Sequence, residues 1–162
     1  MKRQASQVAI AAGATVIVAL VAFVFVGAPF NSPRPTTLRP GDTQVTVLGQ
    51  KLYSANCAAC HGARLEGQPN WRQRDAQGRL PAPPHDATGH TWHHPDDLLF
   101  SITKFGVAKA ANLQSYDSSM PAYESVLTDA EIVAVLSWIK AQWPEDLRAK
   151  HDEMNRSATQ RR

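Results

Sequence analysis

The chain has two cysteines, which lie three residues apart and are followed directly by a histidine, in the order Cys57-Ala58-Ala59-Cys60-His61. Two thiols at this spacing can each add across one vinyl group of a porphyrin and form a thioether bond. The imidazole of His61 would then lie beneath the iron and supply a nitrogen ligand. The pattern therefore predicts covalent attachment of one c-type haem.

Three other roles of a cysteine pair fit the chain less well. A thioredoxin-like redox pair is expected in a βαβ context, and no such context is visible. A structural zinc site would need two further ligands at a matching spacing. A secreted disulfide framework would use more cysteines at longer spacings. Haem attachment is therefore the favoured interpretation.

A sixth ligand for the iron would have to come from another part of the folded chain. Of the three methionines, Met1 is the first residue and Met154 lies in a charged segment, whereas Met120 lies in an irregular stretch before the last predicted helix. Methionine and histidine together raise the reduction potential of a haem and suit electron transfer. They also fill both axial positions and leave none for a substrate. We therefore predict that Met120 is an axial ligand rather than a core-filling side chain.

Two helices are expected before this stretch. The first runs from about Val45 to Ala55, where apolar residues recur at helical spacing and lead into the cysteine motif. The second spans Pro95 to Phe105, because the proline suits a first helical turn and Asp96 and Asp97 suit the positive end of a helix dipole. Gly106 would end this helix.

The last helix has the clearest signals. Thr128 and Glu131 form a capping box at its start. Its apolar face is predicted to consist of Ile132, Val135, Leu136, Ile139 and Trp143. Pro144 ends or interrupts it, and the charged tail 144–162 is expected to continue as a helix to Met154 and then fray. No strand pattern is convincing, so the fold is predicted to be all-α, with roughly three to five helices around one haem.

A long polar connection, residues 62–91, separates the cysteine motif from the second helix. About thirty residues without periodicity are unusual in a small domain, and such loops are usually functional; here the haem would be what the loop wraps. This stretch and its end carry four histidines: His85, His90, His93 and His94. Three interpretations stay open: polar groups of which some bind the haem propionates, a peripheral copper or zinc site, or one histidine replacing the methionine on the iron.

The N-terminal part predicts a membrane anchor. Val8–Ala28 is a run of 21 residues without a charge, and a helix of that length spans roughly 30 Å, the thickness of the hydrocarbon core. Lys2 and Arg3 precede it, which places the N-terminus in the cytoplasm and the rest of the chain in the periplasm. A cleaved signal peptide is the alternative, but its apolar region would be shorter. The proline-rich residues 29–44 would then be an extended tether.

The charge balance excludes one class of partner. Outside Lys2 and Arg3 the chain has 15 basic and 14 acidic residues, so it is close to neutral. A nucleic-acid-binding protein would need a basic face or stripe, so no nucleic-acid partner is expected.

Residues 45–143 resemble a class I monohaem cytochrome c. The resemblance rests on Cys57-x-x-Cys60-His61, on Met120-Pro121-x-Tyr123 and on the spacing of Gly49, Tyr53 and Cys57. It implies that Gly49 and Tyr53 pack against an aromatic residue of the last helix, which Trp138 matches.

The resemblance also implies how the haem pocket is built. A proline carbonyl, for which Pro83 is the first choice, is expected to accept a hydrogen bond from the imidazole of His61 and so orient the ring. Tyr123 is expected in the pocket. Trp92 would pack on the porphyrin edge or be exposed as an anchor for a partner.

These features predict an electron carrier rather than an enzyme, held at the bacterial inner membrane with its haem domain in the periplasm. The expected donor is a quinol-oxidising complex or a periplasmic dehydrogenase, and the expected acceptor is a terminal oxidase or reductase. Two alternatives remain: a cytochrome subunit of a larger oxidoreductase complex, and a haem protein with an added copper-binding histidine loop. An enzyme such as a peroxidase would need an open position on the iron.

Overall fold

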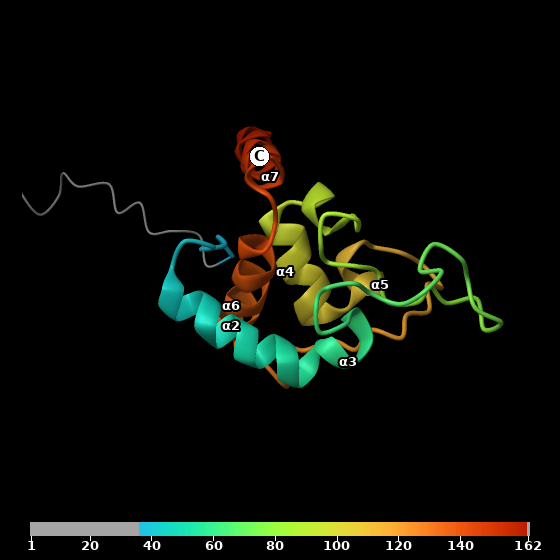
Figure 1. Ribbon diagram of the computed structural model, residues 1–162. Helices are drawn as coiled ribbons and strands as arrows, with labels where there is room; N and C mark the ends of the chain where they lie inside the picture. Colours follow the sequence, from blue (N-terminus) through green and yellow to red (C-terminus); the bar gives the residue numbers. More distant parts are fainter. Residues whose placement is uncertain (1–35, 162) are drawn as a thin grey trace, which may run out of the picture. The chain divides into compact units, whose positions relative to one another are not determined.

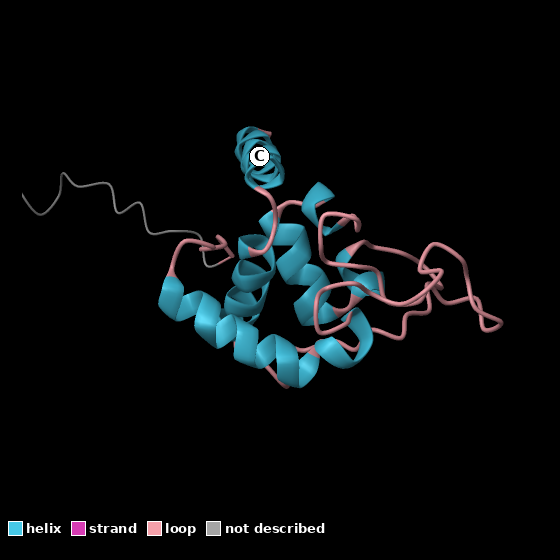
Figure 2. Ribbon diagram, in the orientation of Figure 1, coloured by secondary structure: helices cyan, strands magenta, loops and turns pink. Residues whose placement is uncertain are grey.

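The computed structural model describes residues 36–161, which form helices and loops with no β-strand among them (Figures 1 and 2). The helices are α2 (Thr43–Asn56), α3 (Ala58–His61), the 3-10 turn η1 (Thr91–His93), α4 (Asp96–Phe105), α5 (Val107–Ala110), α6 (Asp129–Ala141) and α7 (Glu145–Gln160). The all-α prediction is therefore confirmed for this part of the chain.

The three predicted helices are present with small shifts at their ends. α2 begins at Thr43, two residues earlier than expected, because the side chain of Asp42 accepts a hydrogen bond from the Val45 amide and caps the helix. α4 starts directly after Pro95. Both hydrogen bonds of the predicted capping box, between Thr128 and Glu131, are present at the start of α6.

The contact between α2 and α6 forms the centre of the fold. A Cβ atom added to Gly49 would lie 2.0 Å from the carbonyl oxygen of Ala134, so only glycine allows the two backbones to come this close. One turn further on, the rings of Tyr53 and Trp138 pack with centroids 4.7 Å apart. The expected packing of Gly49 and Tyr53 against Trp138 is thus confirmed.

The predicted apolar face of the last helix is buried, and it supplies five of the fifteen buried hydrophobic residues of the described chain. The members of that face are Ile132, Val135, Leu136, Ile139 and Trp143, all at most 5% exposed. α6 is buried on other sides as well, because α2 and α4 both contact it. It therefore carries buried polar residues, including Ser137 and Lys140.

The predicted tether is in part a packed segment. Leu38 is 6% exposed, and its amide donates a hydrogen bond to the carboxylate of Asp96. The next amide, of Arg39, donates to the hydroxyl of Ser137. Residues 36–39 therefore lie against the helices instead of forming a free linker, because the amides of Leu38 and Arg39 find acceptors there.

The charged tail is also more ordered than expected. Pro144 ends α6 and takes the N-cap position of α7, which runs to Gln160 instead of fraying after Met154. Leu147 and His151 of α7 are buried. The predicted anchor Val8–Ala28 lies outside the described residues, and within 36–161 no helix is long and apolar enough to cross a membrane.

Candidate functional site

A cavity of about 590 Å³ lies inside the helical part of the chain. This volume is in the range of cofactor and ligand pockets, roughly 300–1,000 Å³. Both motif thiols, Cys57 and Cys60, line it, together with His61 and the distant Met120. Apolar side chains make up much of the remaining wall: Leu98, Leu99, Ile102, Val135, Leu136 and Ile139. The two motif cysteines, His61 and Met120 are thus brought to one cavity.

The imidazole of His61 is held by a backbone carbonyl. Its Nδ1 lies 2.9 Å from the oxygen of Pro83, the residue expected for this role. Since a carbonyl can only accept, Nδ1 carries the proton and Nε2 keeps a free electron pair for a metal ion. Burial lowers the pKa of His61, so the neutral form that can ligate is favoured, although the bond to Pro83 acts in the opposite direction.

A glycine brings Pro83 to this position. Gly67 has a φ of +68°, and a Cβ atom there would lie 2.4 Å from the Pro84 nitrogen. Its amide donates to the carbonyl of His61, and the next amide, of Gln68, donates to the carbonyl of Ala82. The two ends of the long loop therefore run against each other directly beside His61.

Two tyrosine hydroxyls fix the cysteine motif from either side. Tyr53 donates to the carbonyl of Gly62 at 2.8 Å, just after the motif. Tyr123 donates to the carbonyl of Asn56 at 2.7 Å, just before it. Because Tyr123 lies three residues after Met120, its bond ties the methionine segment to the motif across 67 positions of sequence.

Replacement of Tyr123 by phenylalanine is expected to lower the free energy of unfolding by about 1–2 kcal/mol, because the partly buried carbonyl of Asn56 loses its donor. Denaturant titration followed by circular dichroism would measure the change. Tyr116→Phe is the matched control, since the Tyr116 hydroxyl makes no hydrogen bond within residues 36–161. Equal stability of the two variants would contradict the prediction.

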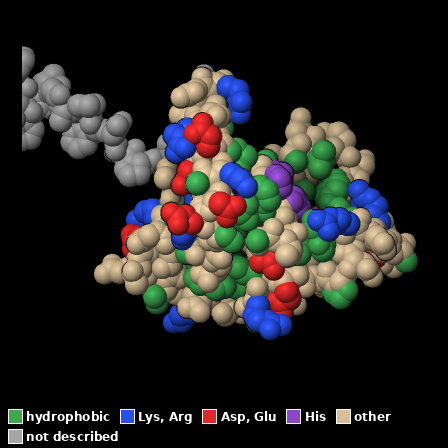
Figure 3. Space-filling view, turned by 45° about the horizontal axis from the view of Figure 1, so that its top comes forward, with side chains coloured by type: hydrophobic (Ala, Val, Ile, Leu, Met, Phe, Trp, Pro, Cys, Tyr) green, Lys and Arg blue, Asp and Glu red, His purple; other side chains and the backbone are tan. Residues whose placement is uncertain are grey.

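Three of the four loop histidines line the cavity: His85, His90 and His94. The ring of His85 stacks on that of His61 with centroids 4.0 Å apart, and its Nδ1 is 2.7 Å from the hydroxyl of Thr91. Burial keeps the pKa of His85 well below its ordinary value, and the electrostatic effect of His61 and His90 lowers this pKa further. Figure 3 shows histidine side chains at the surface next to hydrophobic ones.

These histidines do not form a metal site with other ligands. Within the part of the chain that the structure describes, no three side chains of histidine, cysteine, aspartate or glutamate are grouped so that they could hold a metal ion. His93 is exposed and stacks on Trp92 with centroids 3.6 Å apart.

Tyr123 lines the cavity as expected, but the tryptophan on the cavity wall is not the expected one. Trp92 is not among the lining residues; it packs against the core, and its Nε1 is buried without a hydrogen-bond partner in residues 36–161. Trp71, which the sequence analysis missed, lines the cavity and stacks parallel to His90 at 5.4 Å. The sequence gives one indication of this role, because Trp71 is the one tryptophan within the long connection 62–91.

The donor set of the cavity fits a covalently attached haem. It offers two thiols three residues apart, one imidazole with a free Nε2, one thioether and largely apolar walls. The porphyrin would occupy the apolar space, the thiols would join its vinyl groups, and the imidazole and thioether are the two kinds of axial ligand that suit electron transfer.

Comparison with known proteins agrees with this geometry. The sequence model of the cytochrome c family matches residues 46–143, which is more than half of the chain. Searches among curated proteins and among solved structures gave no match. The matched region contains the cysteine motif, His61 and Met120. The chain therefore belongs to the cytochrome c family and is an electron-carrier protein with covalently bound haem c.

Proposed function

We propose that the protein is a class I monohaem cytochrome in which Cys57 and Cys60 hold the haem as thioethers and His61 and Met120 are the axial ligands. The observation that carries this proposal is the shared cavity, which collects these four side chains from segments about sixty residues apart. The haem supplies one-electron chemistry when it is bound. With both axial positions filled, the iron has no open position for a substrate, so a role as carrier is favoured over a role as enzyme.

The side chains around the haem have separate tasks in this proposal. The carbonyl of Pro83 keeps the proton on Nδ1 of His61 and orients the ring toward the iron. Tyr123 holds the segment of Met120 at the motif. The apolar wall from α4 and α6 excludes water, which favours the less charged, reduced form of the iron.

We further infer that the chain is held at the bacterial inner membrane by Val8–Ala28, with the haem domain in the periplasm. The uncharged length and the preceding Lys2 and Arg3 support this. The chain packs onto the helices from about residue 36, so only residues 29–35 remain between the anchor and the folded part. Seven extended residues span at most about 25 Å.

So short a tether confines the haem near membrane complexes and raises its effective concentration there. A quinol-oxidising complex or a periplasmic dehydrogenase is the proposed donor, and a terminal oxidase or reductase is the proposed acceptor. The short tether also favours the second candidate, a subunit bound permanently to a larger oxidoreductase complex.

The test uses the full chain expressed with its native membranes. Absorption and magnetic spectra in both oxidation states should show covalent haem, low-spin iron and a methionine-to-iron band in the oxidised protein. Reduced protein in membranes should then be reoxidised by the terminal oxidase. High-spin iron would contradict the carrier proposal. If the haem protein co-purifies with a stable set of other subunits, the role as a subunit of a larger oxidoreductase complex is supported over the role as a separate tethered carrier.

A further inference from the structure

Helix α7 lies beyond the region that matches the cytochrome c family, which ends at residue 143. In Figure 1 it stands at the C-terminal end, above the crossing of α2 and α6. Its contact with the rest of the fold is unusually polar. His151 is completely buried, and Lys140 of α6 is 3% exposed. Buried polar and charged groups are costly unless they are paired, so their partners indicate what the contact does.

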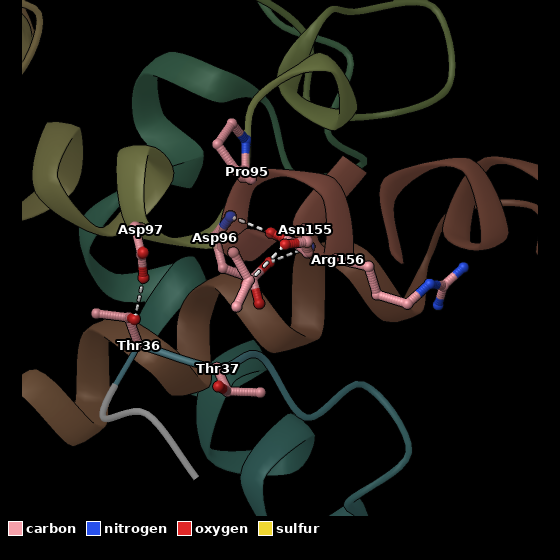
Figure 4. Close-up of a pocket in the computed structure, with 9 residues that line it drawn as sticks. Thr36, Thr37, Pro95, Asp96, Asp97, Asn155 and Arg156 are labelled. Atoms are coloured by element: carbon pink, nitrogen blue, oxygen red, sulfur yellow. Dashed lines mark hydrogen bonds between the residues drawn. The ribbon is translucent and has the colours of Figure 1, made fainter. Parts of the chain in front are cut away.

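The hydrogen bonds of His151 define its protonation. Nε2 lies 2.9 Å from the carbonyl oxygen of His94, which can only accept, so Nε2 carries a proton. Nδ1 lies 3.2 Å from the amide nitrogen of Asn155 and accepts from it. The same amide donates to the carboxylate of Asp96, and the Asp96 backbone amide donates to the Asn155 oxygen (Figure 4). This arrangement requires a neutral imidazole.

Charged groups surround the imidazole of His151 from three helices. They are Lys140 of α6, Asp96 of α4 and Asp152 of α7, and Lys140 pairs with Asp152 at 2.5 Å. The ring of Trp143 packs edge-on at 5.1 Å. Burial has the largest effect on the pKa of His151 and lowers it, and the positive charge of Lys140 lowers it further. The carboxylates of Asp96 and Asp152 and the bond to His94 raise this pKa, but they offset the lowering only in part.

The same contact reaches the haem cavity. His94, whose carbonyl is held by His151, lines the cavity. Trp143, in the turn before α7, donates through Nε1 to the carbonyl of His85 at 2.7 Å, and His85 also lines the cavity. The turn after α6 and the middle of α7 therefore hold the backbones of two cavity residues, His85 and His94, and the ring of His85 stacks on His61.

We propose that His151 is a positioning residue for the haem site: by donating to the carbonyl of His94, it makes helix α7 part of the wall that sets the reduction potential. Loss of this bond loosens the wall and admits water, which stabilises the more charged oxidised iron and lowers the potential. The inference rests on the haem site of the proposed function and not on its membrane anchor or its redox partners.

The bond to His94 does not depend on the protonation of His151, because Nε2 carries its proton in both the neutral and the charged ring. Protonation of Nδ1 would place an N–H against the amide group of Asn155. Since the pKa of His151 is lowered in the folded chain, the ring stays neutral at the ordinary histidine pKa of about 6.5, and the contact with Asn155 is lost only as the pH falls through the lowered pKa. The reduction potential is therefore compared at neutral pH, where both bonds of His151 are present.

The experiment measures the reduction potential of the purified haem protein at neutral pH. His151→Phe removes the donor at similar volume, and His151→Gln keeps an N–H that can reach the His94 carbonyl but does not titrate. Lys150→Gln, at an exposed position one residue earlier, is the control. His151→Phe should have a lower potential, and His151→Gln and Lys150→Gln should both match the wild type.

Two results would overturn the proposal. One is a folded His151→Phe protein whose potential equals that of the wild type. The other, which decides the matter if His151→Phe does not fold, is a folded His151→Gln protein whose potential lies below that of the wild type although it keeps the N–H. The spectra of the same samples report the iron ligands. An altered ligand set in the wild type would count against His61 and Met120 as ligands and not against His151.

Discussion

Gly49→Ala is expected to destabilise the folded chain by about 3 kcal/mol, which is a large part of the stability of a small domain. The added Cβ would lie 2.0 Å from the carbonyl oxygen and 2.6 Å from the carbonyl carbon of Ala134, and these are backbone atoms of a buried helix that has little freedom to move. The better helix propensity of alanine returns only about 1 kcal/mol. Denaturant unfolding of the haem protein, followed by circular dichroism, would measure the difference.

Gly41→Ala is the matched control, because a Cβ atom at Gly41 would meet no other atom within 4 Å. Its effect should stay within about 0.5 kcal/mol. If Gly49→Ala were as stable as this control, the close approach of α2 and α6 would not be part of the fold.

Met120→Leu is expected to change the iron from low-spin to high-spin while leaving the haem attached. Leucine keeps the approximate volume of methionine, so packing against the core is little affected and the lost group is the thioether. Because methionine ligation raises the potential, the variant should be harder to reduce, by about tenfold or more in the equilibrium constant, which is about 59 mV for one electron. Optical and magnetic spectra and a redox titration would measure both changes.

Met154→Leu removes the other internal thioether, which lies in α7 and does not line the cavity, and it should leave spin state and potential unchanged. A Met120→Leu protein that kept the low-spin spectrum would show that another side chain is the ligand. His85, His90 and His94 would then be examined first, since they also line the cavity.

The sequence by itself determined the features that are local. Cys57, Cys60 and His61 are adjacent in one motif, and the capping box of Thr128 and Glu131 lies within one helical turn, so short-range spacing was enough to predict them. The apolar face of α6 was also readable, because burial on a helix follows its period. Met120 could be chosen because the chain has so few methionines.

How the long loop folds back on itself was decided only by the tertiary structure. The resemblance to class I cytochromes suggested Pro83 as the partner of His61, but Pro83 reaches His61 because Gly67 adopts a positive φ and lets two parts of the loop lie against each other, and nothing periodic in the sequence marks that approach. Trp71, and not Trp92, lines the cavity for the same reason: a loop has no repeating face from which the direction of a side chain follows.

The C-terminal helix shows this difference most clearly. Its charged sequence predicted a fraying tail, because polarity normally indicates exposure. In the structure His151 is fully buried, and Asn155 and Asp152 pair with partners on other helices, including the buried Lys140. His151 and Asn155 bond to groups more than fifty residues away, and Asp152 bonds to Lys140 on another helix, twelve residues away. Such pairing depends on where the partners lie in space, so composition and spacing along the chain did not reveal it.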